Sequence, residues 1–216
     1  MRWLNRFRRA SGKENRSKET VSRPVVRAAP GIAAIFAGLR EDRSHGVLDL
    51  STVTEANLRL YGRFAQWIRF GDLLYDPPRG EAWTRALESL PPLPDRPYDV
   101  VMVWNLLDRL PPEDRPPLIA RLAQLTGPGA RLYFLVDGSG GATKRTLHFS
   151  LPDINHVSQE EVGPPFPAQP PILPAGLERI LSPFQVAHAF TLRGGLREYV
   201  AHWQGRDPRA TTWWTR

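Results

Sequence analysis

The run YDVVMVW at residues 98–104 decides the fold class of this chain, because it is the most hydrophobic stretch in the sequence. A strand with one face in water alternates apolar and polar residues, and this run is too continuously apolar for that arrangement. Uninterrupted apolar strands are typical of parallel sheets that are covered on both faces. We therefore expect residues 98–104 to form a central strand of a covered parallel sheet.

The segments on either side of this run alternate between helical and strand periodicity. Apolar residues recur at helical spacing in residues 30–40, 54–64, 81–90 and 111–126. Short apolar runs of strand length occupy residues 45–50, 66–70 and 130–136. Thr54 is a candidate N-cap for the second of these helices. Strands that alternate with helices over short connections predict a doubly wound α/β sheet with right-handed crossovers.

The last third of the chain has a different pattern. Residues 184–192 (FQVAHAFTL) and 196–203 (LREYVAHW) alternate as strands, and Arg193-Gly194-Gly195 between them is a hairpin signal. Residues 150–176 are rich in proline yet keep several large apolar side chains. We expect this segment to be a long surface excursion packed on its own domain, or else an extended arm laid on a partner protein.

The first 27 residues carry the charge imbalance of the chain. They hold nine of its 29 Lys and Arg residues but only two of its 22 acidic residues, so residues 28–216 are formally neutral. We expect three regions: a basic arm at 1–27, one α/β domain at 28–205 and an aromatic tail at 206–216. An arm of this charge favours an anionic surface.

The arm and the tail both have the composition of docking segments. Apolar residues share one face of a short helix at the start of the arm, and arginines surround them; the residues are Trp3, Leu4, Phe7, Arg2, Arg6, Arg8 and Arg9. This pattern suits an anionic membrane, where each basic residue is worth about 1 kcal/mol. Trp213 and Trp214 favour a protein interface. The alternative is a solvated tail without a partner.

Other classes of function find little support in the sequence. The neutral body has no second basic patch, which argues against specific nucleic-acid binding. No run approaches the roughly 20 apolar residues of a membrane span. We expect a cytoplasmic protein, either free or at the membrane face. The chain has no Cys, and its five His show no paired metal-ligand spacing, so we expect no metal site.

Four segments in order resemble the class I methyltransferases that use S-adenosylmethionine. They are VLDL at 47–50, YDVVMVWNLLDRLP at 98–111, GPGARLYFLV at 127–136 and the FTLRGGLREYV hairpin at 190–200. The resemblance covers about residues 30–203. It implies a Rossmann-like sheet of seven strands, six parallel and one reversed at the edge, with a C-terminal antiparallel hairpin. It also implies a cofactor held over the carboxyl ends of the first, second and fourth strands.

The loop after the first strand departs from this family. Relatives have a glycine-rich turn there, because the backbone must approach the cofactor closely. Here residues 51–57 (STVTEAN) contain no glycine and include three β-branched residues. Glu55 stands near the position of a family glycine close to the cofactor carboxylate. Two like charges about 4 Å apart cost about 4 kcal/mol at an effective dielectric near 20, unless Glu55 pairs with the cofactor's ammonium group instead.

The resemblance names the residues that would hold a cofactor if one binds: Asp49, Ser51, Glu55, Asp72 and Asn105. Asp72 is either the ribose-binding acid after the second strand or a turn residue. Asn105 is either a ligand-binding residue or the cap of a strand end. We expect no catalytic residue and no cofactor, and interpret the chain as a non-catalytic accessory subunit docked to a membrane or a protein complex. The alternative is a divergent S-adenosylmethionine-dependent methyltransferase acting on a small molecule or a protein.

Overall fold

Strand β4 (Tyr98–Trp104) lies inside the central sheet, as its hydrophobicity predicts. We describe residues 23–74, 86, 90, 96–138 and 140–203 of a computed structural model. β4 pairs in parallel with β2 (His45–Asp49) on one side and β5 (Thr126–Asp137) on the other. Every residue of β4 except Asp99 is buried, so the strand is covered on both faces.

The central sheet has six strands among the described residues, in the order β10-β11-β5-β4-β2-β3. The remaining strands are β3 (Ala65–Phe70), β10 (Phe184–Thr191) and β11 (Leu196–Trp203). β3, β2, β4 and β5 are parallel, whereas β11 is antiparallel to both β5 and β10. The predicted hairpin is therefore confirmed, with Arg193–Gly195 (η2) between its strands. The reversed strand was expected at the edge of the sheet. In the structure it is β11, which lies between β5 and β10.

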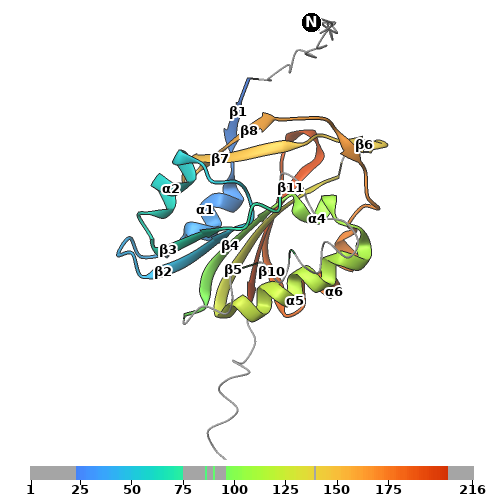
Figure 1. Ribbon diagram of the computed structural model, residues 1–216. Coiled ribbons are helices and arrows are strands. Elements are labelled where there is room, and N and C mark those ends of the chain that lie inside the picture. The colour runs from blue at the N-terminus through green and yellow to red at the C-terminus, as the bar shows by residue number, and fades with distance from the viewer. Residues whose placement is uncertain (1–22, 75–85, 87–89, 91–95, 139, 204–216) are drawn as a thin grey trace, which may run out of the picture.

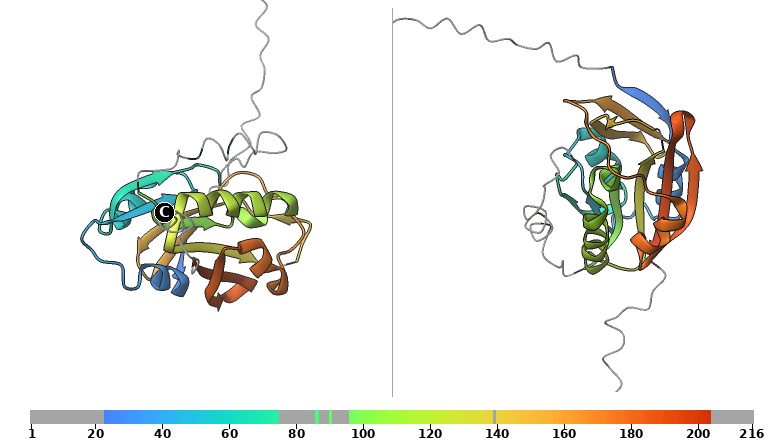
Figure 2. Two further views of the ribbon diagram at one scale, coloured as in Figure 1. Left: turned by 90° about the horizontal axis from the view of Figure 1, so that it is seen from below. Right: turned by 90° about the vertical axis from the view of Figure 1, so that its right-hand side faces the viewer.

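Helices cover both faces of this sheet. α1 (Pro30–Phe36) and α5 (Arg115–Leu125) lie on opposite sides of it (Figure 2). The other helices are α2 (Glu55–Tyr61), α4 (Leu106–Arg109), η1 (Pro112–Asp114) and α6 (Pro174–Leu181). Thr54 caps α2 as predicted, because its Oγ1 accepts a hydrogen bond from the Asn57 amide at 3.0 Å. Most of the helix predicted at 81–90 and any seventh strand there lie outside the described residues.

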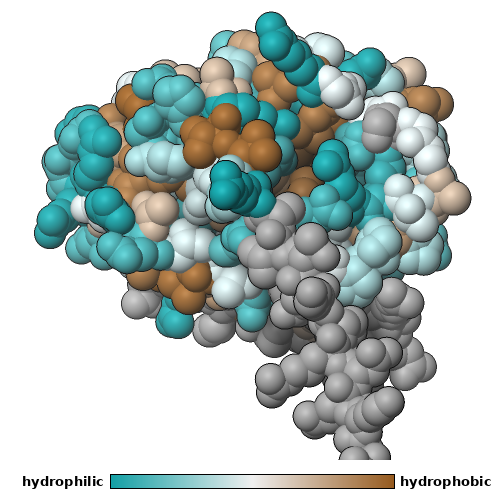
Figure 3. All heavy atoms as spheres, turned by 90° about the horizontal axis from the view of Figure 1, so that it is seen from above, coloured by the Kyte–Doolittle hydropathy of each residue, from teal (hydrophilic) through white to brown (hydrophobic). Residues whose placement is uncertain are grey.

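A second, three-stranded sheet covers the carboxyl edge of the central sheet (Figure 1). It has the order β1-β8-β7, all antiparallel; the strands are β1 (Val25–Ala28), β8 (His156–Glu161) and β7 (Leu147–Asp153). A short pair, β6 (Thr143–Lys144) and β9 (Phe166–Pro167), lies beside it. Seen from above, hydrophobic residues lie between hydrophilic ones on this side of the molecule (Figure 3).

The small sheet corrects two boundaries predicted from the sequence. The segment 150–176 is not an irregular excursion, because it supplies parts of β7 and α6 and the whole of β8 and β9, and it buries Leu151 and Val157. The prolines misled the prediction, since most of them stand between these elements. The predicted arm 1–27 ends too late, because β1 starts at Val25 and pairs with β8.

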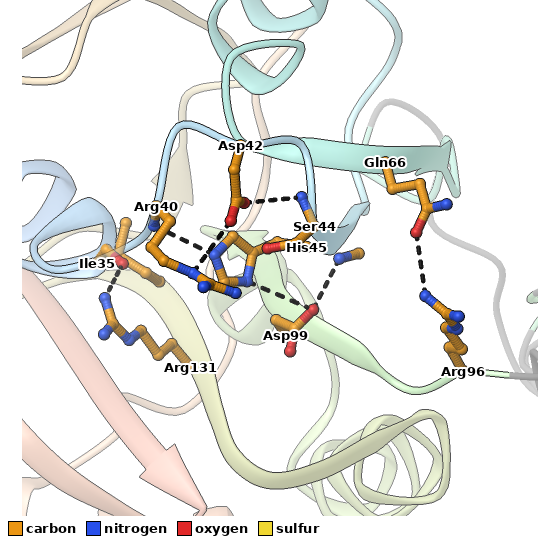
Figure 4. Close-up of polar contacts among 10 residues, drawn as sticks. Ile35, Arg40, Asp42, Ser44, His45, Gln66, Arg96, Asp99 and Arg131 are labelled. Atoms are coloured by element: carbon orange, nitrogen blue, oxygen red, sulfur yellow. Dashed lines mark hydrogen bonds and ion pairs between the residues drawn. The ribbon is translucent and has the colours of Figure 1, made fainter.

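The amino edge of the central sheet is held by polar contacts near the surface (Figure 4). Arg131 of β5 donates from Nη1 to the Ile35 carbonyl at 2.7 Å, which fixes the end of α1. Asp99 Oδ2 accepts from the Gly46 amide at 2.7 Å, which ties β4 to the start of β2. These contacts position the frame whose opposite edge carries the candidate site. Within the described part of the chain, no helix has the length and apolarity needed to cross a membrane.

Candidate functional site

Asp49, the last residue of β2, lies at the centre of a buried polar cluster at the carboxyl edge of the sheet. Its side chain has no solvent exposure. Oδ1 accepts hydrogen bonds from Trp104 Nε1 at 2.7 Å and from the Ser51 amide at 2.8 Å. Oδ2 accepts from Tyr61 Oη at 2.7 Å and from Asn57 Nδ2 at 3.2 Å. A carboxylate has about four lone-pair sites, and the chain itself fills all of them.

Burial raises the pKa of Asp49, because a charge is disfavoured away from water. The hydrogen bonds from Tyr61, Ser51 and Trp104 act in the opposite direction and favour the ionised form. A carboxylate in such a place is tolerable only when its oxygens are hydrogen-bonded. The four donors are therefore what allows Asp49 to be buried.

Trp104 closes the cluster from the end of β4. Its backbone is left-handed, with φ of 56°, an uncommon conformation for a residue other than glycine. Its indole stacks on Phe149 of the small sheet, with ring centroids 4.9 Å apart and planes at 7°, and contacts Tyr133 edge-on. The side chain is completely buried. Trp104 thus joins the central sheet to the small sheet directly above Asp49.

Asn57 makes a second connection between the cluster and the small sheet. Its Nδ2 donates to Asp49, and its Oδ1 accepts from the Leu151 amide of β7 at 2.8 Å. Asn57 and Tyr61 lie four residues apart on α2, so one helix face presents both to Asp49. The nitrogen and the oxygen of the Asn57 side-chain amide are therefore both hydrogen-bonded, and the residue is completely buried.

The loop after β2 does without glycine because none of residues 51–54 is left-handed. Thr52 Oγ1 donates to Asp72 Oδ1 at 2.6 Å, so Asp72 fastens this loop from the end of β3. Asp72 itself has φ of 49°. The amides of Leu73 and Leu74 both donate to the Leu50 carbonyl, at 2.9 and 3.1 Å. Backbone bonds and the Thr52–Asp72 contact therefore join the carboxyl ends of β2 and β3.

Glu55 is not where the sequence argument required it. Its side chain is 90% exposed and pairs with Arg59, one helical turn later, at 3.1 Å. The predicted repulsion between Glu55 and a cofactor carboxylate therefore stays a prediction, and the geometry adds that Glu55, the first residue of α2, is exposed to solvent. The residues that close the site are Trp104, Asn57 and Tyr61 instead.

A cavity of about 190 Å³ lies next to this cluster. Asn105, which follows β4, contributes to its wall and is only 6% exposed. The Asn105 side chain does not cap α4, and its Oδ1 has no hydrogen-bond partner among residues 23–74, 86, 90, 96–138 and 140–203. Asp108 of α4 also lines the cavity and accepts from the Asp137 amide at 2.6 Å. Burial raises the pKa of Asp108 to about 6.

The structure brings together some of the predicted site residues and separates others. Asp49 and Ser51 are in one cluster, Asp72 borders it through Thr52, Asn105 faces the neighbouring cavity, and Glu55 is exposed. The i, i+4 spacing of Asn57 and Tyr61 after an acid-ending strand was a usable signal for two residues that the sequence analysis missed. The predicted docking residues of the arm and tail, between 2 and 9 and at 213 and 214, lie outside the described residues.

Comparisons with known proteins bear on the fold. No protein-family model matches the chain, and no curated protein matches its sequence. A 1,6-didemethyltoxoflavin-N1-methyltransferase from Burkholderia thailandensis is 17% identical, with 82% of this chain and 77% of that chain covered and a TM-score of 0.49. The glycopeptide N-methyltransferase MtfA is 16% identical, with 80% and 89% covered and a TM-score of 0.43.

A TehB-like methyltransferase from Corynebacterium glutamicum is 12% identical, with 80% of this chain and 86% of that chain covered and a TM-score of 0.47. The strand order and the reversed β11 confirm the predicted fold class, a doubly wound and mostly parallel sheet with a C-terminal antiparallel hairpin. The three methyltransferases named above are solved structures to which the chain is similar, and the fold class itself rests on the strand order of the chain.

Proposed function

We propose that this chain is a methyltransferase-like protein that does not bind S-adenosylmethionine and acts as a non-catalytic accessory subunit. The observation that carries the proposal is the complete use of the Asp49 carboxylate by four donors of the chain, with no solvent exposure. An acid that holds a cofactor must leave at least one oxygen open to it. The residues around Asp49 therefore do not fit the cofactor.

The energetic cost of opening the site is considerable. A hydrogen bond to a charged group is worth about 1.5–3 kcal/mol, so giving up two of the four costs about 3–6 kcal/mol. Such a penalty weakens binding by roughly two to four orders of magnitude. Displacing Trp104 would also break its stacking on Phe149. A ligand would have to supply this energy before it gained any contact of its own.

The charge distribution supports a docking role for the rest of the proposal. The excess of positive charge lies in residues 1–27, while the remaining residues are balanced. A basic segment attached to a neutral domain favours attachment through the segment, to an anionic membrane face or to an acidic surface of a larger complex. The predicted docking residues Arg2, Trp3, Leu4, Arg6, Phe7, Arg8 and Arg9 would make that attachment, with Trp213 and Trp214 at a protein interface.

The docking role is tested by removing residues 1–22, which leaves β1 intact because it starts at Val25. The full chain should sediment with vesicles of phosphatidylserine and phosphatidylcholine at low salt and be released at high salt. The truncated chain should remain in the supernatant with an unchanged melting temperature. Vesicles of phosphatidylcholine alone are the control. Binding that survives both the truncation and high salt contradicts the electrostatic attachment.

The absence of cofactor binding is tested by thermal melts. A ligand that binds only the folded state raises its stability by RT ln(1 + [L]/Kd). We expect no change in melting temperature with S-adenosylmethionine or S-adenosylhomocysteine at about a hundred times the concentration that saturates an active control enzyme. An upward shift that grows with the logarithm of ligand concentration contradicts the proposal.

A divergent methyltransferase remains the second candidate, because one observation favours it. The cavity beside the Asp49 cluster contains Asn105 with an unpaired Oδ1 and Asp108 with a pKa of about 6. Buried groups of this kind gather at functional sites. Under this alternative the cavity would hold the methyl acceptor, a small molecule or a protein side chain, and the cofactor would require Asp49 to exchange its present partners. The melts with S-adenosylmethionine separate the two candidates.

A further inference from the structure

The 190 Å³ cavity lies between the two sheets of the molecule and is partly open to solvent. The inner face of the small sheet forms one wall. In the strand register Val25 is opposite Gln159, and Gln159 is opposite Phe149, so Arg27, two residues after Val25, falls on the same face as these residues. Asn105, beyond β4, and Asp137, at the end of β5, form the opposite wall. The cavity therefore lies over the carboxyl edge of the central sheet, beside the Asp49 cluster.

Three side chains on these walls have buried polar atoms without a hydrogen-bond partner in the part of the chain that the structure describes. They are Nε and Nη2 of Arg27, Nε2 of Gln159 and Oδ1 of Asn105. An unsatisfied buried group costs about 1–3 kcal/mol. Native proteins rarely keep such groups without a reason, and a missing ligand is one of the ordinary reasons. Together these side chains bring three donor atoms and one acceptor atom to the same cavity.

The charges on the walls favour an anion near Arg27. Lys144 pairs with Asp137 at 3.2 Å, and Asp108 accepts from the Asp137 amide, so the acids of the cavity have partners within the chain. Arg27 makes no ion pair within 4 Å among the described residues. The acidic groups that interact electrostatically with Arg27 are Tyr133 and Glu198, and the Glu198 oxygens accept from Tyr133 Oη at 2.9 Å and from the Gly31 amide at 2.7 Å. The guanidinium thus keeps its hydrogen-bonding edge free.

The rest of the lining combines two further arginines, Arg145 and Arg193, with a set of apolar and aromatic side chains. Leu147 and Phe149 contribute from β7, Phe166 from β9 and Leu196 from β11. Ligand sites combine such surfaces with a few placed polar groups. The volume is below the range of about 300–1,000 Å³ that is usual for drug-sized ligands, so the occupant must be small. It is nevertheless several times the roughly 30 Å³ share of one water molecule.

We propose that this cavity binds a small organic carboxylate with an apolar body and a hydrogen-bond donor at its far end. The carboxylate accepts from Arg27 and Gln159, the body packs between Phe149 and Phe166, and the donor group bonds to Asn105 Oδ1. An arginine fork matches the two oxygens of a carboxylate. This inference does not depend on the proposed accessory role, because it concerns a different set of residues from the Asp49 cluster.

The experiment is a calorimetric titration of the full chain with 4-hydroxybenzoate, which has a carboxylate, a ring and a hydroxyl donor in that order. The uncharged 4-hydroxybenzamide is titrated alongside at matched ionic strength. We expect 4-hydroxybenzoate to bind at millimolar concentration or below and the amide to bind at least tenfold more weakly, because the arginine fork then faces a neutral group.

Two variants locate the binding. Arg27→Gln should raise the dissociation constant about ten- to hundredfold, and Asn105→Ala about three- to tenfold, since a charged contact is the stronger one. Arg59→Gln removes the same charge from an exposed position on α2 and should change nothing. Because Arg27→Gln also removes a cation near Glu198, the comparison of benzoate with benzamide on the unaltered chain provides a test that does not rely on that variant folding.

The outcomes are distinct from those of the cofactor melts. No binding of 4-hydroxybenzoate at 5 mM, equal binding of the acid and the amide, or binding that survives both Arg27→Gln and Asn105→Ala overturns the proposal and leaves a cavity filled by water. Binding of S-adenosylmethionine would overturn the accessory role, and the titration with 4-hydroxybenzoate would still decide whether this cavity binds a carboxylate.

Discussion

Two groups of buried polar residues stand side by side at the carboxyl edge of the same sheet, and they differ in one respect. In the Asp49 cluster every oxygen of the carboxylate has a donor from the chain. In the neighbouring cavity Arg27, Gln159 and Asn105 retain unpaired atoms. A polar group that is fully satisfied contributes to structure, whereas one that is buried and unsatisfied is a candidate for binding. The comparison therefore indicates a binding role for the cavity and a structural role for Asp49.

Removing Trp104 should have the largest effect on stability. Trp104→Ala takes a donor from Asp49, leaves a cavity and loses the stacking on Phe149, so the free energy of unfolding should fall by about 3–5 kcal/mol. Urea denaturation measures it. Trp104→Phe keeps a ring in place and removes mainly the donor, so its free energy of unfolding should fall by only about 1–3 kcal/mol. If both variants were as stable as the unaltered chain, Trp104 would not be part of the cluster that we describe.

Exchanging the acid itself should have the next largest effect. Asp49→Asn keeps one acceptor oxygen but turns an NH₂ group toward donors, so unfolding should become easier by about 2–4 kcal/mol. Asp72→Asn is the matched control, because its carboxylate is exposed and accepts, among the described residues, from Thr52 alone, and asparagine tolerates its positive φ. The control should stay within about 0.5 kcal/mol of the unaltered chain. Equal losses in the two variants would contradict the structural role of Asp49.

Asp108, in the wall of the cavity, should make the stability of the protein depend on pH. Burial raises the pKa of Asp108 to about 6, so the folded state holds a proton that the unfolded state releases near its ordinary value. This contribution is present at low pH and is lost as the pH rises through 6, amounting to about 1 kcal/mol between pH 5 and 7.5. Asp108→Asn should abolish that part of the pH dependence. Identical pH profiles for the two proteins would show that the pKa is ordinary.

Gln159→Met should change the free energy of unfolding least, and the sign of the change is informative. Gln159 has an unpaired Nε2 on the cavity wall, and an apolar side chain of similar length removes the unsatisfied group. We expect the free energy of unfolding to be unchanged or higher by up to about 1 kcal/mol. A loss of 1.5 kcal/mol or more would mean that Gln159 is a structural residue like Asn57, and the contrast between the two groups would disappear.

The sequence predicted the frame of this protein well, because long apolar and periodic segments leave few alternatives. β4, the helix cap at Thr54 and the Gly-Gly hairpin were all found. The small sheet was missed because β7 and β8 are short, partly polar strands among prolines, and their pairing with Val25–Ala28 joins residues more than a hundred positions apart. Local patterns do not reveal pairings of that range.

The candidate site was predicted less completely. Asp49 and Asn105 were named from the resemblance to class I methyltransferases, and the absence of glycine from residues 51–57 was read from the sequence. The reason offered for the poor fit of this loop to a cofactor, repulsion by Glu55, stays a prediction, because that side chain is exposed and pairs with Arg59. What closes the site is a set of donors from α2 and β4, and the direction of a side chain such as Trp104 depends on a left-handed backbone that the sequence does not announce.

The most direct test of the account is a calorimetric titration of the full chain with S-adenosylmethionine, since the central claim is that Asp49 has no hydrogen-bonding capacity left for it. We predict no heat of binding up to 1 mM ligand, under conditions in which an active methyltransferase of this fold gives a saturating signal. A saturable heat with a dissociation constant in the micromolar range, abolished by Asp49→Ala in a chain that still folds, would contradict the account.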